Sequence, residues 1–423
     1  MPGTGAIYQP QWRLSPDQER ALREWIKEML RAALIRPSIS PHGAPTFCIK
    51  KAVEWRVVHD YRAMNAKTVR QSTPMPIKDA IFDRMSTSLW YSCFDLLPGY
   101  SQMRMRTKDI PYTAFQTPDG LFEYIAVPMG LNNAPATFNR IVQRIFEEMR
   151  ECVATYFDAI YVFTKTNNVE EHVAAVRRVF ERCREKKLYL KLSKSIICAE
   201  EISCLGDFVG RQGVRIDPDK VRVVREWPLP RTIRNLQSFL GPTVYVQRFC
   251  QLFSEISAPL FEMVKRKDRK QLEWTPERVR AFEALKTALS QTPVLALPDF
   301  TKPFLLRTDA SQFAVGGVLL QTIRSSDGTQ DTEKPIAYCG RKMNSAELNY
   351  PTHEQEMLVI SLPARWRLHG RDGSSLAREG THPEDNKQKN LSLNFNYNFD
   401  TFLAQRTSSQ TLRAAARSSR STS

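Results

Sequence analysis

The chain has 423 residues, and its Lys and Arg outnumber its Asp and Glu by 61 to 45. This length allows roughly two to four compact units, each with a sizeable core of its own. The net charge of +16 and the pI near 9.5 favour phosphate-rich partners, and nucleic acid is the usual one. A soluble basic protein with solvated charged faces is the alternative that charge alone leaves open.

Cysteine spacing and apolar runs narrow the class of protein further. The eight cysteines are scattered without a Cys-x-x-Cys pair, so the sequence indicates neither a zinc site nor a disulfide framework. The N-terminus lacks an apolar signal core, and no apolar run approaches the roughly 18 residues that span a bilayer. We therefore expect an intracellular protein, cytoplasmic or nuclear, that does not enter a membrane.

The first predicted element is a helix that follows a leader, residues 1–13. Ser15 and Gln18 form a capping box, and Pro16 suits the first helical position. Apolar residues then keep the helical period, which predicts that the helix continues until Pro37.

Strands and helices alternate over the next part of the chain. An alternation of this kind with long returns predicts an α+β sheet domain that carries its helices on one side. In chain order we expect a basic hairpin (47–49 and 55–58), a strand ending at Asp95, a helix from Pro135, a strand over 156–163 and a helix over about 169–186.

Helices are expected to dominate after Cys204. Asp217 and Thr232 are good helix caps, and a third helical stretch covers about 276–290. A new unit starts near Pro303. In it we expect strands over 304–309 and 313–321, a polar turn over 325–333, and a disordered tail beyond Gly370, where apolar periodicity ends.

Two acidic residues lie beside apolar strands. Asp95 belongs to Phe94-Asp95-Leu96-Leu97-Pro98-Gly99-Tyr100, and Asp158 belongs to Tyr156-Phe157-Asp158-Ala159. Carboxylates that neighbouring strands bring together can bind Mg²⁺, which prefers oxygen ligands. Taken separately, each aspartate is more often a strand-end or turn residue, so the interpretation depends on the surrounding motifs.

Further motifs accompany the two aspartates in a fixed order along the chain. They are the run from Trp55 to Asn65, the run from Phe94 to Met105, Tyr112 to Phe115, Val127 to Phe138, and a series from Phe239-Leu240-Gly241 to Thr308-Asp309-Ala310-Ser311. In these motifs the chain resembles the reverse transcriptases of gypsy-type LTR retrotransposons over roughly residues 14–369, and the run from Phe94 to Met105 resembles their first palm motif.

The resemblance implies a right-hand polymerase fold followed by a truncated RNase H-like α/β domain. The expected domains are fingers (14–92), palm with part of the fingers (93–210), thumb or connection helices (211–292), an incomplete RNase H-like domain (293–370) and a tail (371–423). It implies a reverse transcriptase domain over about 50–210, with RNA or DNA template-primer and dNTPs as partners. The oligomeric state is left open.

The resemblance also implies roles for individual residues. Asp95 and Asp158 would bind two Mg²⁺ ions, with Mn²⁺ as a possible substitute. Arg56, with Lys50 or Lys51, would contact the triphosphate, Tyr100 would lie under the sugar, Met129 and Gly130 would lie against a base, and Cys204, Leu205 and Gly206 would form the primer grip. A solvated hairpin is the alternative for Lys50 and Lys51, a packed core tyrosine for Tyr100, and a plain tight turn for Gly206.

One residue departs from the family pattern, in which the second palm motif reads Tyr-x-Asp-Asp. Ala159 replaces the second aspartate and removes one negative charge beside the metal site. We expect the fold, metal binding and primer-template binding to persist and polymerisation to be impaired. The rival hypothesis is a catalytically dead nucleic-acid-binding relic of a retrotransposon.

The RNase H-like part is expected to be defective as well. Asp309 and Glu356 resemble its first two catalytic, metal-binding acids, and Thr352 caps the Glu356 helix. Pro363 falls inside that helix, where it removes a backbone hydrogen bond. The sequence after Gly370 matches nothing in the family, so we expect no RNase H cleavage.

Overall fold

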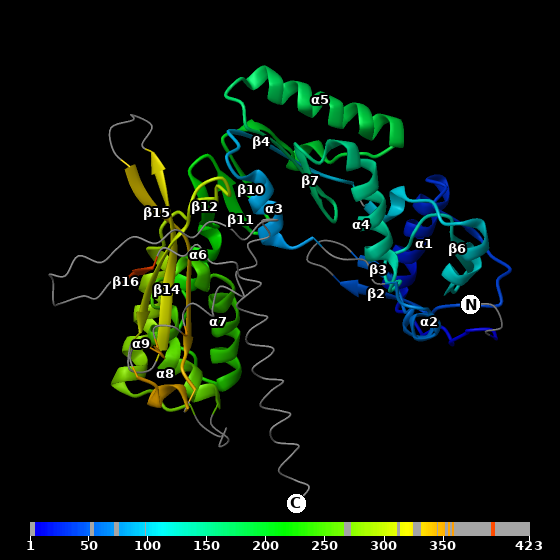
Figure 1. Cartoon of the computed structure of the whole chain (residues 1–423). Helices are drawn as coiled ribbons and strands as arrows, with labels where there is room; N and C mark the ends of the chain where they lie inside the picture. Colours follow the sequence, from blue (N-terminus) through cyan, green and yellow to red (C-terminus); the bar gives the residue numbers. More distant parts are fainter. Residues whose placement is uncertain are drawn as a thin grey trace, which may run out of the picture. The chain divides into compact units, whose positions relative to one another are not determined.

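The structure is a computed structural model that describes residues 5–50, 55–71, 76–97, 99–265, 272–310, 314–324, 331–344, 346–351, 354–355, 358 and 391–393. The chain divides into two compact units. The first comprises Met1–Arg84 and Ser88–Ile202, and the second comprises Met85–Thr87 and Ser203–Ser423. Figure 1 shows the elements of both units in sequence colours.

The first helix begins as predicted and ends earlier. In α1 (Pro16–Arg31), Ser15 accepts a hydrogen bond from the Gln18 N–H, and the Gln18 side chain accepts one from Ser15, so the capping box is confirmed. The prediction that the helix reaches Pro37 is wrong, because Ala33 takes a left-handed φ of 51° and Ile35–Pro37 forms strand β1. Pairing of β1 with β6 (Gly120–Tyr124) outweighs the helical apolar period there.

A small sheet and a hairpin form the rest of this region. The sheet has the order β1-β6-β5, with β5 at Phe115–Thr117, and the predicted hairpin is confirmed as β2 (Thr46–Lys50) and β3 (Trp55–His59). Leu22 and Ile26 of α1 share a buried cluster with Phe115. Two short helices that the sequence analysis did not predict follow, α2 (Arg62–Lys67) and α3 (Lys78–Met85).

A four-stranded antiparallel sheet positions the two aspartates. Its order is β7 (Val153–Tyr156), β8 (Ala159–Thr164), β4 (Trp90–Asp95), β9 (Ile196–Ala199). Helices α4 (Ala134–Ile145) and α5 (Val169–Lys186) share one buried cluster with this sheet, and α5 packs against β4 and β8 (Figure 1). Because the strand residues Phe94 and Ile160 belong to that cluster, both helices cover the same face, as predicted.

The strand predicted over 156–163 is two strands joined by a turn. Tyr156 ends β7, Ala159 begins β8, and Phe157 between them has a left-handed φ of 50°. The apolar run concealed this turn because Tyr and Phe are not turn-forming residues. Instead, the side-chain oxygen of Asn139 on α4 accepts a hydrogen bond from the Phe157 N–H at 3.0 Å.

The second unit opens with strands where helices were expected. A three-stranded sheet has the order β10 (Glu201–Cys204), β11 (Asp207–Gly210), β12 (Gly213–Ile216), so the helical region starts later than predicted. The caps Asp217 and Thr232 are confirmed at α6 (Pro218–Arg225) and α7 (Ile233–Tyr245). Helix α9 (Pro276–Ser290) was predicted, and α8 (Phe253–Lys265) was not.

A further sheet in this unit has the order β15-β14-β13-β16. Its strands are β13 (Leu305–Ala310), β14 (Ala314–Arg324), β15 (Asp331–Lys342) and β16 (Leu391–Leu393). The predicted polar turn over 325–333 is too long, because β15 already begins at Asp331, and it pairs with β14 as far as Arg324. Helix α8 packs against β14 and β15 (Figure 1).

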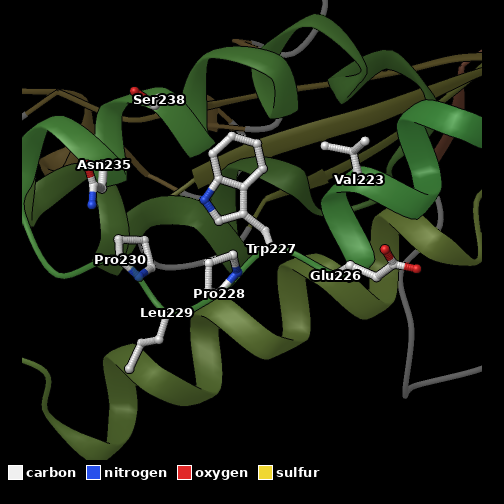
Figure 2. A pocket seen from close by; sticks show the side chains of 8 residues that line it. All are labelled: Val223, Glu226, Trp227, Pro228, Leu229, Pro230, Asn235 and Ser238. Atoms are coloured by element: carbon white, nitrogen blue, oxygen red, sulfur yellow. The ribbon is translucent and has the colours of Figure 1, made fainter.

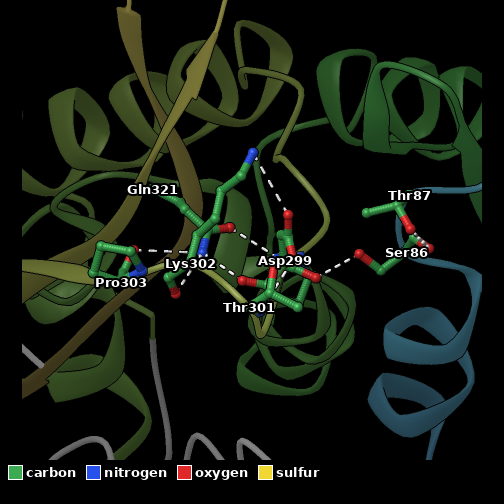
Figure 3. A network of polar contacts seen from close by, with 8 residues as sticks. Ser86, Thr87, Asp299, Thr301, Lys302, Pro303 and Gln321 are labelled. Carbon is green, nitrogen blue, oxygen red and sulfur yellow. Dashed lines mark hydrogen bonds and ion pairs between the residues drawn. The ribbon is translucent and has the colours of Figure 1, made fainter. Parts of the chain in front are cut away.

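The loop before β13 is fixed by side-chain hydrogen bonds (Figure 3). Buried Gln321 of β14 donates to the carbonyls of Asp299, Lys302 and Pro303, and accepts from the Asp299 N–H at 2.8 Å. Ser86 donates to the Pro298 carbonyl, and both residues belong to the second unit.

A pocket of about 520 Å³ lies at the junction of α6 and α7. In Figure 2 the Trp227 ring lies at the centre of the lining residues, with Val223 on one side and Asn235 and Pro230 on the other. The ring meets Phe239 edge to face at a centroid distance of 5.8 Å. The described residues also form short 3₁₀ helices, which are η1 (Gly99–Gln102), η2 (Thr107–Thr113), η3 (Glu147–Met149), η4 (Leu192–Lys194), η5 (Gln247–Phe249) and η6 (Glu347–Asn349).

Candidate active site

Asp95 and Asp158 lie at the same edge of the four-stranded sheet in the first unit. Asp95 is the last residue of β4, and Asp158 is in the turn that joins β7 to β8. The Leu96 N–H donates to the Asp158 carbonyl at 2.8 Å, which fixes the two segments against each other. The structure therefore brings the two predicted metal ligands together.

The strand register determines what stands beside Asp95. Asp95 pairs with Ala159, and the Leu96–Asp158 hydrogen bond makes this a non-hydrogen-bonded pair, in which side chains approach most closely. Phe94 and Ile160, one position further along, are both 0% exposed beneath the helices. Because strand residues alternate in direction, Asp95 and Ala159 face the side of the sheet that carries neither α4 nor α5. A carboxylate at 159 would stand opposite that of Asp95.

A lysine that the sequence analysis missed lies beside Asp95. The Lys194 ammonium is 3.9 Å from the Asp95 carboxylate, and the Lys191 N–H donates to the Asp95 carbonyl at 2.7 Å. The Asp95 side chain is 33% exposed and that of Lys194 is 62% exposed. Water screens such an ion pair, so it contributes little stability and leaves the carboxylate accessible.

Tyr100 lies close to Asp158 and against α4. Burial and the charge of Asp158 both raise the pKa of the Tyr100 hydroxyl. Its ring meets Phe138 edge to face at a centroid distance of 5.2 Å. A Cβ added at Gly99 would approach two ring atoms of Phe138 at 2.5 Å, so only glycine allows this close contact.

The residues expected to contact the nucleotide are partly brought together. The Arg56 guanidinium approaches the Met129 sulfur at 3.2 Å, and the Met129 side chain is 51% exposed. Gly130 has a φ of 101°, a conformation that favours glycine. Asn65, also missed from the sequence, holds this turn by donating to the Gly130 carbonyl at 2.8 Å.

The two candidate lysines of the hairpin differ in what the structure shows. Lys50 pairs with Trp55, and Ile49 pairs with Arg56, so the register places Lys50 and Arg56 on opposite faces of the hairpin. The Lys50 ammonium instead lies 5.9 Å from the centroid of the Trp55 ring. Lys51 lies outside the described residues.

The expected primer grip is the turn between β10 and β11. Leu205 and Gly206 have φ values of 50° and 79°, as in the tight turns that close two-residue hairpins. Tyr245 of α7 donates to the Leu205 carbonyl at 3.0 Å, and Lys220 of α6 donates to the Gly206 carbonyl. Cys204 is 0% exposed and anchors the turn in the core of the second unit.

The RNase H-like acids are only partly described. The backbone of Asp309 lies in β13 and pairs with Gly316 of β14. Glu356, Thr352 and Pro363 lie outside the described residues, as does the expected tail over 371–423 apart from Leu391–Leu393. The structure therefore does not place the second acid relative to the first.

The described residues contain neither a membrane-spanning helix nor a cluster of metal-ligating side chains. None of their helices is both long enough and apolar enough to cross a membrane. Nor do they hold a group of three or more His, Cys, Asp or Glu side chains placed to share one metal ion.

Two family models match this chain. Residues 49–209 match the model described as reverse transcriptase (RNA-dependent DNA polymerase). Residues 274–365 match the model described as an RNase H-like domain found in reverse transcriptase.

Curated relatives come from flies and yeast. The retrovirus-related Pol polyproteins from transposons 297 and opus of Drosophila melanogaster are 34% identical over 365 residues and 32% identical over 370 residues. The Tf2-3 polyprotein of Schizosaccharomyces pombe is 31% identical over 357 residues. Each match covers 84% of this chain, and 33%, 36% and 26% of the relative, respectively. The chain thus spans between about a quarter and about a third of the length of these relatives.

Solved structures share the fold. The foamy viral protease-reverse transcriptase matches with a TM-score of 0.76 in a complex with double-stranded DNA and of 0.71 in a complex with an RNA/DNA hybrid. Both are 24% identical and cover 86% of this chain, which covers 62% and 48% of them. The chain consists of a reverse transcriptase domain followed by an RNase H-like domain, homologous to the corresponding region of gypsy-type LTR retrotransposon Pol polyproteins.

Proposed function

We propose that this chain carries an RNA-directed DNA polymerase site in which Asp95 and Asp158 are the metal ligands and Ala159 limits the rate. One observation carries the proposal. Asp95 pairs with Ala159, and the Leu96 N–H donates a hydrogen bond to the Asp158 carbonyl. The end of β4 and the β7–β8 turn therefore form one acidic edge. The proposed partners are an RNA or DNA template-primer and dNTPs.

The donor set fits Mg²⁺. Both side chains offer carboxylate oxygens, the ligands that Mg²⁺ and Mn²⁺ prefer, and Asp95 is half-buried while Asp158 is exposed. When bound, two such ions lower the pKa of the attacking hydroxyl and offset the charge of the triphosphate. Asp95 and Asp158 would hold them.

Other residues of the first unit would bind and orient the nucleotide. Arg56 offers a planar guanidinium that suits a phosphate, and its contact with Met129 positions it beside an exposed apolar surface. Tyr100 is held by Phe138 and lies near Asp158, which suits a residue that packs under the sugar. In the second unit, we propose Leu205 and Gly206 as the primer grip, because side chains of α6 and α7 donate hydrogen bonds to both of their carbonyls.

Ala159 weakens this site in a definite way. It removes one of three negative charges from an edge that must offset two dications, while its small side chain leaves the strand pairing of β8 intact. Losing a catalytic carboxylate commonly costs orders of magnitude in rate, at about 1.4 kcal/mol of barrier for each tenfold. We therefore propose that nucleic-acid binding persists and that nucleotide incorporation is slow.

Primer extension by the chain and by its Ala159→Asp variant tests the proposal. Restoring the acid should raise the incorporation rate by at least about a hundredfold, and Asp158→Asn in the same variant should abolish the gain. A variant no faster than the original chain would show that Ala159 is not what limits the site.

A non-catalytic nucleic-acid-binding relic is the second candidate, and the missing acid together with the net charge of +16 favours it. Template-primer affinity that falls steeply with salt, with no incorporation by either the chain or Ala159→Asp, would support the relic. Incorporation by the original chain would rule it out.

We also propose that the RNase H-like domain does not cleave hybrid RNA. Asp309 and Glu356 are its proposed remnant metal ligands. The segment Arg365 to Gly370 is followed by no family-like aspartate, and two acids alone form an incomplete two-metal site. Cleavage of an RNA/DNA hybrid by the chain would contradict this.

A further inference from the structure

A second cavity of the first unit has no part in the site described above. Its volume is about 520 Å³, and it lies among α2, the strand-like segment 103–106 and α4. None of Asp95, Asp158, Arg56 or Tyr100 lines it. Its size is that of a pocket for one small organic group.

The floor of this cavity is apolar. Met103 and Val127 are buried members of the cluster that supports the four-stranded sheet, and Met105 and Leu131 pack against the same cluster. Tyr112 adds an aromatic ring to the lining. Methionine and tyrosine side chains of this kind make favourable contacts with flat aromatic rings.

The rim of the cavity is cationic. Lys67, Arg104, Arg106 and Arg140 line it and are exposed, and Asp109 is its one carboxylate. Arg106 binds Asp109 at 2.7 Å, so these two charges offset each other. Within the described part of the chain, Lys67, Arg104 and Arg140 form no ion pair. The lining therefore presents three uncompensated positive charges around an apolar floor.

One wall of the cavity is fixed before any ligand arrives. The Asn133 side chain, at the start of α4, donates to the Val69 carbonyl at 2.9 Å and accepts from the Gln71 N–H at 3.0 Å. A preformed wall lowers the ordering cost of binding.

Asn65 connects this cavity to the nucleotide-facing turn. It lines the cavity, donates to the Gly130 carbonyl at 2.8 Å and accepts from the Asn132 N–H at 2.9 Å. A ligand that contacts Asn65 would therefore act on the turn that carries Met129 and Gly130.

We propose that this cavity is a second binding site for a nucleotide unit, in which the base lies on the methionine and tyrosine floor and Arg104, Arg140 and Lys67 bind its phosphate. Apolar and aromatic surfaces interleaved with cations form the general design of sequence-tolerant nucleotide and single-strand sites. The same chemistry is presented by a free nucleoside triphosphate and by one residue of a single strand. The proposal goes beyond the polymerase site and does not require that site to be active.

Charge reversal at the rim tests the proposal on the full chain without divalent cations, which minimises binding at Asp95 and Asp158. The variant is Arg104→Glu with Arg140→Glu. The matched control is Arg20→Glu with Arg31→Glu, which makes the same change of net charge on exposed residues of α1. The probes are dTTP, followed by calorimetry, and a short fluorescein-labelled oligothymidylate, followed by anisotropy.

We expect the rim variant to lose at least about tenfold in affinity for one or both probes, and the control to lose less than about threefold. A loss for the oligothymidylate alone assigns the site to a strand, and a loss for dTTP alone assigns it to the free nucleotide. Equal losses in variant and control, or none in either, would overturn the proposal.

Crosslinking to the unaltered chain tests the proposal even if the rim variant fails to fold. An oligothymidylate that carries 4-thiothymidine, irradiated with the unaltered chain, should attach to the peptide that contains Met105 and Tyr112. Attachment to other peptides only would overturn the proposal for a strand, and 4-thio-dTTP applies the same test to the free nucleotide.

Discussion

Ala159 occupies the position on β8 that faces Asp95 across a close, non-hydrogen-bonded pair. An aspartate there would add a third carboxylate within reach of Asp95, and like charges that face each other across strands repel. Lys194, 3.9 Å from Asp95, offsets part of the existing negative charge. We therefore expect the alanine to make this edge more stable without metal ions and to weaken the binding of two metal ions there.

The effect of a third carboxylate at position 159 can be measured as a change in the free energy of unfolding. In a chelating buffer, Ala159→Asp should lower the free energy of unfolding by about 0.5–1 kcal/mol, because it adds a like charge beside Asp95. Millimolar Mn²⁺ should restore more stability to the variant than to the original chain, since ligands that bind the folded state stabilise it. Urea titrations with and without Mn²⁺ provide the measurement, and Ala159→Asn is the uncharged control. A variant whose stability does not respond to Mn²⁺ would contradict the placement of residue 159 beside the metals.

Gly99 supports Tyr100 by allowing Phe138 to approach. In Gly99→Ala the new Cβ would lie 2.5 Å from two atoms of the Phe138 ring, so the ring would have to move. We expect the variant to lose about 1–3 kcal/mol of unfolding free energy. In a Phe138→Leu background the same change should cost clearly less, because the contacted ring is absent. Equal costs in both backgrounds, measured by urea denaturation, would show that the close contact is unimportant.

At the scale of elements, one buried histidine joins a helix to the sheet beneath it. His172 of α5 is 0% exposed, and its ring nitrogens lie 2.8 Å from the Ser92 hydroxyl of β4 and 2.9 Å from the Thr164 hydroxyl of β8. Ser92 also accepts from the Cys198 N–H of β9 at 3.0 Å. Burial lowers the pKa of His172 to about 4, so the ring is neutral in the folded state.

This pKa gives the first unit a pH-dependent stability. Below about pH 6.5 the unfolded chain protonates His172 while the folded chain does not, so stability falls as pH drops towards about 4. The loss from this group should reach about 3 kcal/mol, at about 1.4 kcal/mol for each pKa unit. His172→Gln should show a shallower pH dependence between about pH 6.5 and 4, by up to one proton, in denaturation experiments. An unchanged slope would mean that His172 titrates normally.

Local sequence patterns were sufficient to predict some elements but not others. Caps at Ser15, Asp217 and Thr232 marked helix starts, because a capping side chain acts within one turn of its own residue. The β7–β8 turn could not be located in the same way, since Asn139 fixes it from another element. Lys194 and Asn65 were missed for the same reason, because only tertiary structure brings them beside Asp95 and Gly130.

At the scale of the whole molecule, the chain combines a reverse transcriptase domain with an RNase H-like domain. Its net charge is +16. It spans about a third of the length of the two fly polyproteins, so the activities of those whole polyproteins are not assigned to it. A distributed positive charge binds nucleic acid whether or not a site turns over, so affinity alone does not separate an impaired polymerase from a relic.

The rate of a single nucleotide incorporation separates them most directly. It should be measured in Mg²⁺ with enzyme in excess over a primed template, for the original chain, for Ala159→Asp and for Ala159→Asp with Asp158→Asn. We expect slow incorporation by the first, a rate at least about a hundredfold higher for the second, and none for the third. Equal rates for the first two proteins would contradict the claim that the residue facing Asp95 sets the activity of this site.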